Sequence, residues 1–376
     1  MNWKVEQLPI YELSTGDTFS IKTYTLSNGV GPHVHIQASV HGAELQGNAI
    51  ILRLMEQLKA EDLQGSITFI PLANPLATNN KHGTYTFGRT NPHTGDNWNR
   101  NYTDIIEKTD FDIKEFCSKN LDKDWQQIKS AFKIELENLF KDHISQLQSS
   151  HQLSENNYLN LILQKTAAKA DVILDLHTGP IATEYLYCAH YEKEIAKYLN
   201  FPYVLFMPDE FAGAMDEAAF SPWIKLKESL AELGKEIELD VYSLTCELGS
   251  EEVFSMTSQS DQLEGIINFL KFNKVLSGEI QTYPYKSCEL SDNKTYQAPH
   301  GGLVDYKLSP YDTFKKGDTL CSTYKLNKLD PTNPIASTKF DLIAQEDGLI
   351  INRCPSSAVQ KGMELYQVMT NISSSE

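Results

Sequence analysis

The sequence predicts an α/β fold, with a mixed but mostly parallel sheet flanked by helices and a small β-domain at the carboxyl end. Strand-like and helix-like patterns alternate to about residue 273, and this alternation is typical of a parallel sheet covered by helices. Residues 170–179 read as a largely apolar strand of the kind buried on both faces. From about residue 283 helical periodicity disappears. We therefore predict a large α/β domain at residues 1–282 and a small β-domain at residues 283–376.

Composition restricts the classes of function. The 376 residues contain no run of roughly 18 uncharged apolar residues, so we expect no membrane span. A formal net charge of -17 opposes binding to nucleic acid or to an anionic membrane, and it favours a small-molecule partner. The first residues lack the apolar core of a secretory signal, and the six cysteines have irregular spacing. Both observations predict a cytoplasmic protein with reduced thiols.

The amino-terminal third predicts strands that lead into a helix. Residues 19–27 alternate apolar and polar side chains, as a half-buried strand does, and a second strand at residues 33–40 ends at His41. A helix follows, with apolar positions at Leu45, Ala49, Leu52 and Met55. A third strand is expected at residues 66–70. Residues 76–102 are rich in Gly, Asn, Thr and Pro, and such a long irregular stretch is often functional.

The middle of the chain predicts helices and then two further strands. Residues 104–168 have a charged, helical pattern, which we interpret as two or more surface helices or a lid. The strand at residues 170–179 contains His177 near its end, and a strand at residues 237–248 contains Glu247 near its end. Side chains beyond the carboxyl ends of parallel strands gather at one edge of a sheet.

Two segments of the carboxyl-terminal region resemble each other. Residues 298–304 precede a Lys-Gly turn at residues 316–317, and residues 344–350 precede a second Lys-Gly turn at residues 361–362. The gap between Gly302 and the first Lys-Gly turn is nearly equal to the gap between Gly348 and the second. Because one hairpin cannot bury its own apolar face, we expect a duplicated β-hairpin unit that closes into a small β-domain.

Three side chains predict a metal site. His41 and Glu44 are three residues apart where a strand turns into a helix, so both can reach one point. An isolated pair of this kind could also be a structural histidine followed by a helix-capping glutamate. His177, near the end of a buried strand, supplies the third ligand. Two histidines and one carboxylate form a catalytic zinc set that leaves a fourth position for water, so one Zn²⁺ ion is expected.

Chemistry at such a site requires a base and groups that bind the substrate. Glu247 is the candidate base, with a solvated carboxylate at the sheet edge as the alternative. Arg89 and Arg100 are two of only four arginines and lie in the irregular stretch. One of them could stabilise an oxyanion and the other could hold a substrate carboxylate, or both could be surface residues.

Together these motifs resemble the zinc carboxypeptidase superfamily, specifically its succinylglutamate desuccinylase/aspartoacylase branch, over about residues 30–255. The resemblance rests on the following motifs: His41-x-x-Glu44, Asn74-Pro75, Asn99-Arg100, His177 in Asp-Leu-His-Thr-Gly, and Glu247 in Cys-Glu-Leu-Gly. It implies a zinc carboxypeptidase-like fold followed by a small β-domain. It also implies that His41, Glu44 and His177 bind zinc. Glu247 would be the general base, and Arg89 would polarise the scissile carbonyl. Asn99 and Arg100 would bind the substrate carboxylate. The family often has Asp two residues before the Asn-Arg pair, where this chain has Asn97.

We therefore hypothesise a zinc-dependent metallohydrolase that cleaves an amide bond next to a free carboxylate. Its substrate would be a small acylated amino acid or a short peptide, so the sequence leaves deacylase and carboxypeptidase open. A catalytically silent zinc-binding or ligand-binding protein on the same fold is the alternative. That alternative predicts loss of a ligand or of the base, yet all four residues are present.

Overall fold

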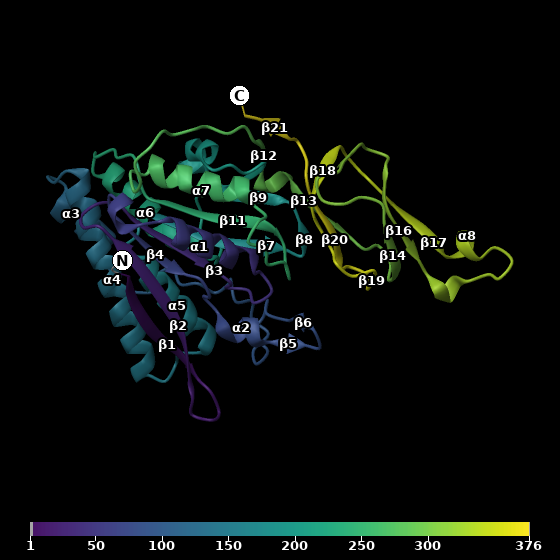
Figure 1. Ribbon diagram of the computed structural model, residues 1–376, viewed down its shortest axis with the longest axis horizontal. Coiled ribbons are helices and arrows are strands. Elements are labelled where there is room, and N and C mark those ends of the chain that lie inside the picture. The colour runs from purple at the N-terminus through teal and green to yellow at the C-terminus, as the bar shows by residue number, and fades with distance from the viewer. Residues whose placement is uncertain (1–2, 376) are drawn as a thin grey trace.

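The computed structural model describes residues 3–375 and contains a large mixed sheet with helices on both faces (Figure 1). In sheet order its strands are β1 (Lys4–Glu12), β2 (Thr18–Ser27), β4 (Ser66–Ile70), β3 (His33–Ala38), β7 (Val172–Gly179), β11 (Tyr242–Ser250), β9 (Glu184–Ala189), β10 (Tyr203–Met207), β12 (Lys286–Glu289) and β21 (Ser373–Ser374). The pairs β4–β3, β3–β7, β7–β11, β9–β10 and β10–β12 are parallel. The predicted α/β class with a mostly parallel sheet is confirmed.

Alternation along the central strands separates a purely apolar face from a face that carries polar groups. On β7, Val172, Leu174 and Leu176 belong to the main apolar core, whereas Asp175 and His177 point to the other face. The same alternation on β3, β11 and β9 places the polar or aromatic residues of all four strands together on that second face. The sheet thereby brings residues from distant parts of the chain to one surface.

Helices cover both faces. The apolar face packs against α1 (Gln46–Gln57), α7 (Ser260–Phe272) and the 3-10 helix η2 (His190–Tyr198). The second face packs against α5 (Glu155–Ala167) and α6 (Met215–Glu232), while α3 (Ile113–Asn120) and α4 (Trp125–Ser149) form a further cluster outside them. In the described part of the chain, no helix is both long and apolar enough to cross a membrane.

The helices predicted within residues 104–168 are present as α3, α4 and α5. The side chain of Asp124 begins α4 by accepting a hydrogen bond from the Gln127 amide, and Ser154 caps α5 in the same way. These helices pack on the sheet and on α6, and none of their described residues lines the pocket that opens beside His41, Glu44 and His177. The interpretation as a lid is therefore wrong, because their apolar faces are already used to build the core.

Two details of the predicted elements differ. The buried face of α1 is formed by Ala49, Ile50, Ile51 and Leu54, whereas Leu52 is 44% exposed. The helix contains more apolar residues than one face can hold, so helical spacing alone did not identify which of them are buried. The strand predicted at residues 237–248 begins only at Tyr242, the first residue of β11.

The irregular stretch at residues 76–102 lies over the carboxyl edge of the sheet. It contains α2 (Pro75–Asn79), which Asn74 caps through a hydrogen bond from the Ala77 amide, and a small hairpin of β5 (Lys81–His82) and β6 (Tyr85–Thr86). The 3-10 helix η1 (Ala60–Asp62) precedes β4.

The carboxyl-terminal strands form two small sheets beside the large one (Figure 1). Their bounds are β13 (Asn293–Gln297), β14 (Gly302–Tyr306), β15 (Thr313–Phe314), β16 (Thr319–Tyr324), β17 (Lys339–Ile343), β18 (Gly348–Arg353), β19 (Ala358–Val359) and β20 (Glu364–Met369). The 3-10 helices η3 (Leu290–Asp292) and η4 (Leu326–Lys328) and the helix α8 (Pro334–Thr338) complete the segment.

Pairing in these sheets has an internal two-fold pattern. β14 pairs with β16 and β19, as β18 pairs with β20 and β15. β13 pairs with β20, as β17 pairs with β16. The glycines of the two Lys-Gly turns, Gly317 and Gly362, both have positive φ, which explains why the repeat keeps glycine there. The repeated pairing agrees with the duplicated unit expected from the sequence.

The carboxyl-terminal segment is attached to the large sheet at several points. β12 and β21 are strands of that sheet, and β18 also pairs with the short strand β8 (Ile181–Ala182) that follows β7. Leu349 and Ile351 of β18 share one apolar cluster with Tyr185 and Leu205 of the large sheet. The division of the chain between residues 282 and 283 stays a prediction.

Candidate metal centre and active site

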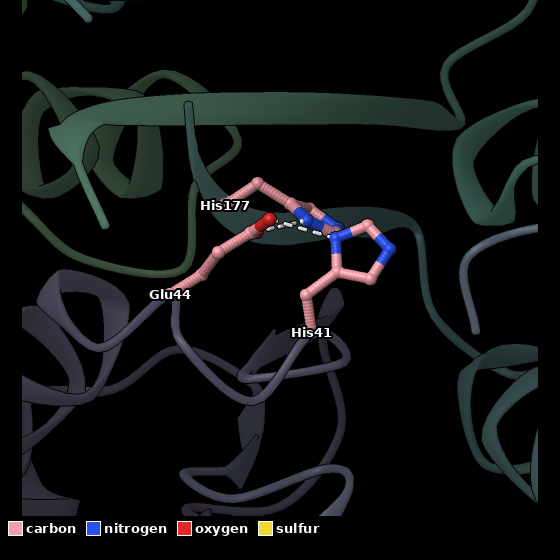
Figure 2. Close-up of side chains that lie close together, drawn as sticks. All are labelled: His41, Glu44 and His177. Carbon is pink, nitrogen blue, oxygen red and sulfur yellow. Dashed lines mark hydrogen bonds and ion pairs between the residues drawn. The ribbon is translucent and has the colours of Figure 1, made fainter. Parts of the chain in front are cut away.

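Three side chains converge at the carboxyl edge of the large sheet. The Nδ1 atoms of His41 and His177 each lie 2.7 Å from a different oxygen of Glu44, and the three donor groups lie within 4.8 Å of one another (Figure 2). All three residues are buried. The sequence analysis predicted from motif spacing and strand ends that these three residues meet, and the structure places them in one group.

The loop that carries His41 and Glu44 follows β3 and precedes α1. It begins at Ser39, whose φ of 60° turns the chain sharply at the sheet edge. The Ser39 hydroxyl donates to the carbonyl of Glu44 at 3.1 Å, and the Thr178 amide donates to Glu44 Oε2 at 3.2 Å. These bonds fix the carboxylate between the two imidazoles.

Each imidazole is also held on its far side. Nε2 of His41 lies 2.8 Å from Asn97 Oδ1, and Nε2 of His177 lies 2.8 Å from Asp175 Oδ2. Because oxygen acceptors take a proton from Nε2, Nδ1 is the nitrogen of each ring that faces Glu44, and it would offer its lone pair to a cation that replaces the proton shared with the carboxylate. Two imidazole nitrogens and one carboxylate directed at one point fit a zinc ion. Asn97 thus orients the ring of His41, a role that the sequence analysis did not predict.

A chain of buried hydrogen bonds continues behind His177. Asp175 Oδ1 accepts from Gln37 Nε2 at 3.1 Å, and Gln37 Oε1 lies 3.0 Å from His35 Nε2. His35 and Gln37 are fully buried on β3, next to Asp175 on β7. His33 and His35 are not part of the metal group.

The charges of the group support one another. Burial alone would raise the pKa of Glu44, but the neighbouring His41 and His177 outweigh it and hold that pKa well below its usual range. Burial alone would lower the pKa of His177, yet Asp175 and Glu44 raise it well above its ordinary value. The carboxylates therefore favour positive charge at this point, as a cation site requires.

Glu247 lies beside the group on the neighbouring strand. In the β7–β11 pairing, Glu247 stands opposite His177. Its Oε2 atom is shielded from solvent and has no hydrogen-bond partner among residues 3–375. Burial, followed by the charge of Glu44, raises the pKa of Glu247 to about 8, with His177 and Arg89 acting in the opposite direction. A carboxyl group of this kind can accept and release a proton near neutral pH.

Arg89, which was predicted to polarise the scissile carbonyl, and Asn99 and Arg100, which were predicted to bind the substrate carboxylate, also reach this edge. Nη1 of Arg89 lies 3.7 Å from Glu44 Oε1, and its side chain is mostly exposed to the pocket opening. Nδ2 of Asn99 lies 3.4 Å from His177 Nε2, and its Oδ1 has no partner in the described chain. Nη1 of Arg100 donates to the carbonyl of Asn99 at 2.6 Å. All three residues line the same pocket.

This pocket has a volume of about 1090 Å³. Its wall includes four residues that the sequence did not single out: Tyr185, Tyr187, Asp216 and Asn352. The tyrosines share the polar face of the sheet with Glu247 through strand alternation on β9, which the sequence pattern could have shown. Asp216 of α6 and Asn352 of β18 reach the pocket only through tertiary packing.

The fold and the site together define a mixed α/β protein with a candidate metal centre at the carboxyl edge of its sheet. The family model described as "Succinylglutamate desuccinylase/Aspartoacylase catalytic domain" matches residues 30–273. The chain belongs to this family.

Solved structures support the assignment over the whole chain. A succinylglutamate desuccinylase/aspartoacylase family protein from Shewanella amazonensis is 35% identical, with a TM-score of 0.90 and coverage of 99% of this chain and 100% of that one. A similar protein from Shewanella frigidimarina is 33% identical, with a TM-score of 0.91 and coverage of 99% and 98%. The carboxyl-terminal strands are therefore part of the architecture that these proteins share.

One curated relative has a named activity. The N-alpha-acetyl-L-2,4-diaminobutyric acid deacetylase of Halomonas elongata is 23% identical over 357 residues, which cover 91% of this chain and 83% of the relative. The similarity extends beyond the catalytic-domain match into the carboxyl-terminal strands.

Proposed function

We propose that this protein is a zinc-dependent hydrolase that removes the acyl group from a small N-acyl amino acid. The observation that carries the proposal is the juxtaposition of three converging metal donors with the unpartnered carboxylate of Glu247. Family membership and the named activity of the Halomonas elongata relative support an enzyme that acts on acylated amino acids.

The metal would be held by His41, Glu44 and His177. A zinc ion in this position supplies Lewis acidity, which activates water and polarises an amide carbonyl. Asn97 and Asp175 accept from Nε2 of the two imidazoles and so keep Nδ1 of each ring turned toward the position that the ion would occupy.

The remaining residues act on the proton and on the substrate. Glu247 accepts a proton from the attacking water at its Oε2 atom and returns it to the amine nitrogen when the amide bond breaks. Arg89 donates to the carbonyl oxygen as negative charge develops there. Asn99 and Arg100 hold the carboxylate of the amino acid and so fix the position of the scissile bond.

Metal analysis combined with one substitution tests this proposal. Purified protein is expected to contain one zinc ion per chain and to release amine from N-acetyl amino acids in a chelator-sensitive reaction. Glu247→Gln is expected to retain zinc and to lose about 10²- to 10⁴-fold in kcat, the range typical of a general base. The neighbouring pocket carboxylate provides the matched control, and Glu251→Gln should lose far less.

Two results would contradict the proposal. Zinc-loaded protein without activity on any N-acyl amino acid would indicate a binding protein instead. Full activity in Glu247→Gln would remove the proposed base.

A further inference from the structure

Five large apolar side chains lie exposed beside the pocket of the candidate active site. Tyr85 begins β6 and is 69% exposed, Phe87 follows that strand and is 59% exposed, and both line the pocket. The other three belong to the segment after β11. We call the set the apolar rim; its members are Tyr85, Phe87, Val253, Phe254 and Met256. Exposed apolar side chains that gather in one place, unlike single ones, indicate a surface that binds a ligand or a partner.

Backbone hydrogen bonds hold both segments of the apolar rim against the loop that carries two of the candidate metal ligands. The Gly42 amide donates to the carbonyl of Gly88 at 2.9 Å, and the Glu252 amide donates to the carbonyl of Ala43 at 2.8 Å. Gly42 and Ala43 are the two residues between the ligands of this loop. The Thr86 amide donates to Glu252 Oε1, which joins the two segments to each other. The apolar rim therefore borders the metal group.

Phe87 is fixed in its exposed position. Its amide donates to the carbonyl of Asn80 at 2.7 Å, and its carbonyl accepts from Asn80 Nδ2 at 3.2 Å. Its ring contacts that of His82 edge-on, with the ring centroids 5.3 Å apart. Because contact of an aromatic ring with water is unfavourable, a ring held in this way is suited to bind an apolar group.

The apolar rim lies on the side of the site where the acyl group would extend. Under the proposed function, the amino-acid carboxylate is held beside His177, since Asn99 Nδ2 lies 3.4 Å from the ring of His177. Arg89, which would contact the scissile carbonyl, instead lies 3.7 Å from the oxygen of Glu44 that contacts the other imidazole. Arg89 is two residues after Phe87. The acyl chain leaves the scissile carbonyl on the side away from the carboxylate and so points toward the apolar rim.

The size and charge of the pocket agree with a long, uncharged acyl group. The pocket has a volume of about 1090 Å³, whereas pockets for drug-sized ligands measure roughly 300–1,000 Å³. An amino acid with an acetyl group fills only part of this space. Glu251 and Glu252, which directly precede the apolar rim residue Val253, also line the pocket and oppose a negatively charged acyl group.

We propose that the substrate carries an apolar acyl group of medium length, such as hexanoyl, whose chain lies on the apolar rim. The inference rests on the proposed function and adds the chemical class of the acyl group to it. The reaction is hydrolysis: the water oxygen bonds to the acyl carbon, the C–N bond breaks, and the amino-acid nitrogen takes a proton. The apolar rim is continuous with the pocket, which favours the substrate over a second protein chain as its occupant.

A series of acyl groups on one amino acid tests the inference. Zinc-loaded enzyme is assayed with the acetyl, butyryl, hexanoyl and succinyl derivatives of the amino acid whose acetyl derivative reacts fastest. Full burial of one methylene is worth about fourfold, so a surface that covers one side of the chain is worth about twofold. Hexanoyl is four methylenes longer than acetyl and is expected to exceed it in kcat/KM by about 10- to 20-fold. Butyryl should exceed succinyl, which has the same number of carbons.

Substitutions on the two segments locate the effect. Phe87→Ser and Phe254→Ser should each lower the ratio of hexanoyl to acetyl kcat/KM, and the double variant should bring it to about threefold or less. Ile134→Ser is the control, because Ile134 is 60% exposed on α4, none of whose described residues lines the pocket. Its ratio should equal that of the wild type. A hexanoyl substrate no better than acetyl would overturn the inference, and so would a preference for succinyl or an unchanged ratio in the double variant.

A binding measurement separates this inference from the proposed function. Calorimetry is performed on zinc-loaded protein with sodium hexanoate and sodium acetate, the acids that hydrolysis would release. We expect hexanoate to bind about 10-fold or more tightly than acetate, and the double variant to lose this difference. Absence of all hydrolysis would contradict the proposed function, and the hexanoate titration would still decide the role of the apolar rim.

The oligomeric state tests the competing occupant. Sedimentation of the wild type and of the double variant is compared at the same protein concentrations. A dimer that dissociates in the double variant, together with equal binding of hexanoate and acetate, would assign the apolar rim to a contact between two copies of this chain and overturn the inference.

Discussion

His177 is held by a chain of groups on the side of its ring that faces away from Glu44. Asp175 bonds to its ring, Gln37 bonds to Asp175, and His35 bonds to Gln37. His35 is fully buried, and burial lowers its pKa, so the ring is neutral and donates from Nε2. His35 donates to Gln37 and Gln37 donates to Asp175, while the other oxygen of Asp175 accepts from His177, so Asp175 is fixed from both sides.

Gln37→Leu is therefore expected to weaken zinc binding about 10-fold or more, because groups behind a metal ligand commonly contribute 10- to 100-fold to affinity. The apparent dissociation constant is measured by competition with a chromogenic chelator. His33→Gln is the control, since the His33 ring bonds to Thr68 and lies outside the chain of bonds. Equal zinc affinity in Gln37→Leu and in wild-type protein would show that Asp175 needs no support.

The buried charge of Asp216 should cost stability. Burial, followed by the charge of Glu217, raises its pKa to about 6, and Asp175 of β7 adds to the rise. A carboxyl group whose pKa is higher in the folded state favours folding at low pH, and this contribution is lost as pH rises through about 6.

We accordingly expect Asp216→Asn to stabilise the metal-free protein by up to about 3 kcal/mol at pH 7.5 and by much less at pH 4.5. Urea unfolding at the two pH values measures the difference. A variant no more stable than the wild type at pH 7.5 would contradict a charge penalty at this position.

At the scale of elements, close backbone packing positions the loop that carries the candidate ligands. Gly42 donates its amide to the carbonyl of Gly88 at 2.9 Å. A Cβ atom on Gly42 would lie 2.1 Å from the carbonyl group of Ala77 in α2. The loop is thus held between α2 and the segment that leads to Arg89.

Gly42→Ala should force these segments apart, with a loss of about 1–3 kcal/mol in unfolding free energy, as is typical of overpacking, and a parallel loss of zinc affinity. Thermal unfolding and chelator competition measure the two effects. Gly301→Ala is the control, because its Cβ would meet the nearest atom at 3.4 Å. Normal zinc affinity in Gly42→Ala would show that the loop tolerates displacement.

The sequence predicted those features that depend on local pattern. Strand periodicity and the HxxE spacing located His41, Glu44 and His177, since parallel strands end at one edge. Tertiary packing decided the rest. The buried face of α1 depended on which of several apolar residues met the sheet, so Leu52 was misplaced. Asp216 and Asn352 carry no motif, and only the docking of α6 and β18 brings them to the pocket.

Over the whole molecule, one apolar cluster crosses from the large sheet into the carboxyl-terminal strands. Ile351 and Leu349 are buried against Tyr185 and Leu205. Because both parts share these contacts, we expect a single calorimetric unfolding transition.

Ile351→Ala should lower the midpoint of that transition without splitting it, since removal of a buried isoleucine costs about 2–5 kcal/mol. Ile335→Ala, at a position 66% exposed in α8, provides the control and should change little. Two separate transitions, only one of them shifted by Ile351→Ala, would show that the parts unfold independently.

The exchange of strands between the two repeats has a bearing on ancestry. Since β13 completes its sheet with β20 and β17 completes its sheet with β16, each repeat needs the other to cover its final strand. A primordial polypeptide with one repeat would have reached this arrangement only as a homodimer. Within one chain the two halves need not be identical: Tyr306 and Asn352 are at corresponding positions of the repeats, and of these two residues Asn352 lines the pocket.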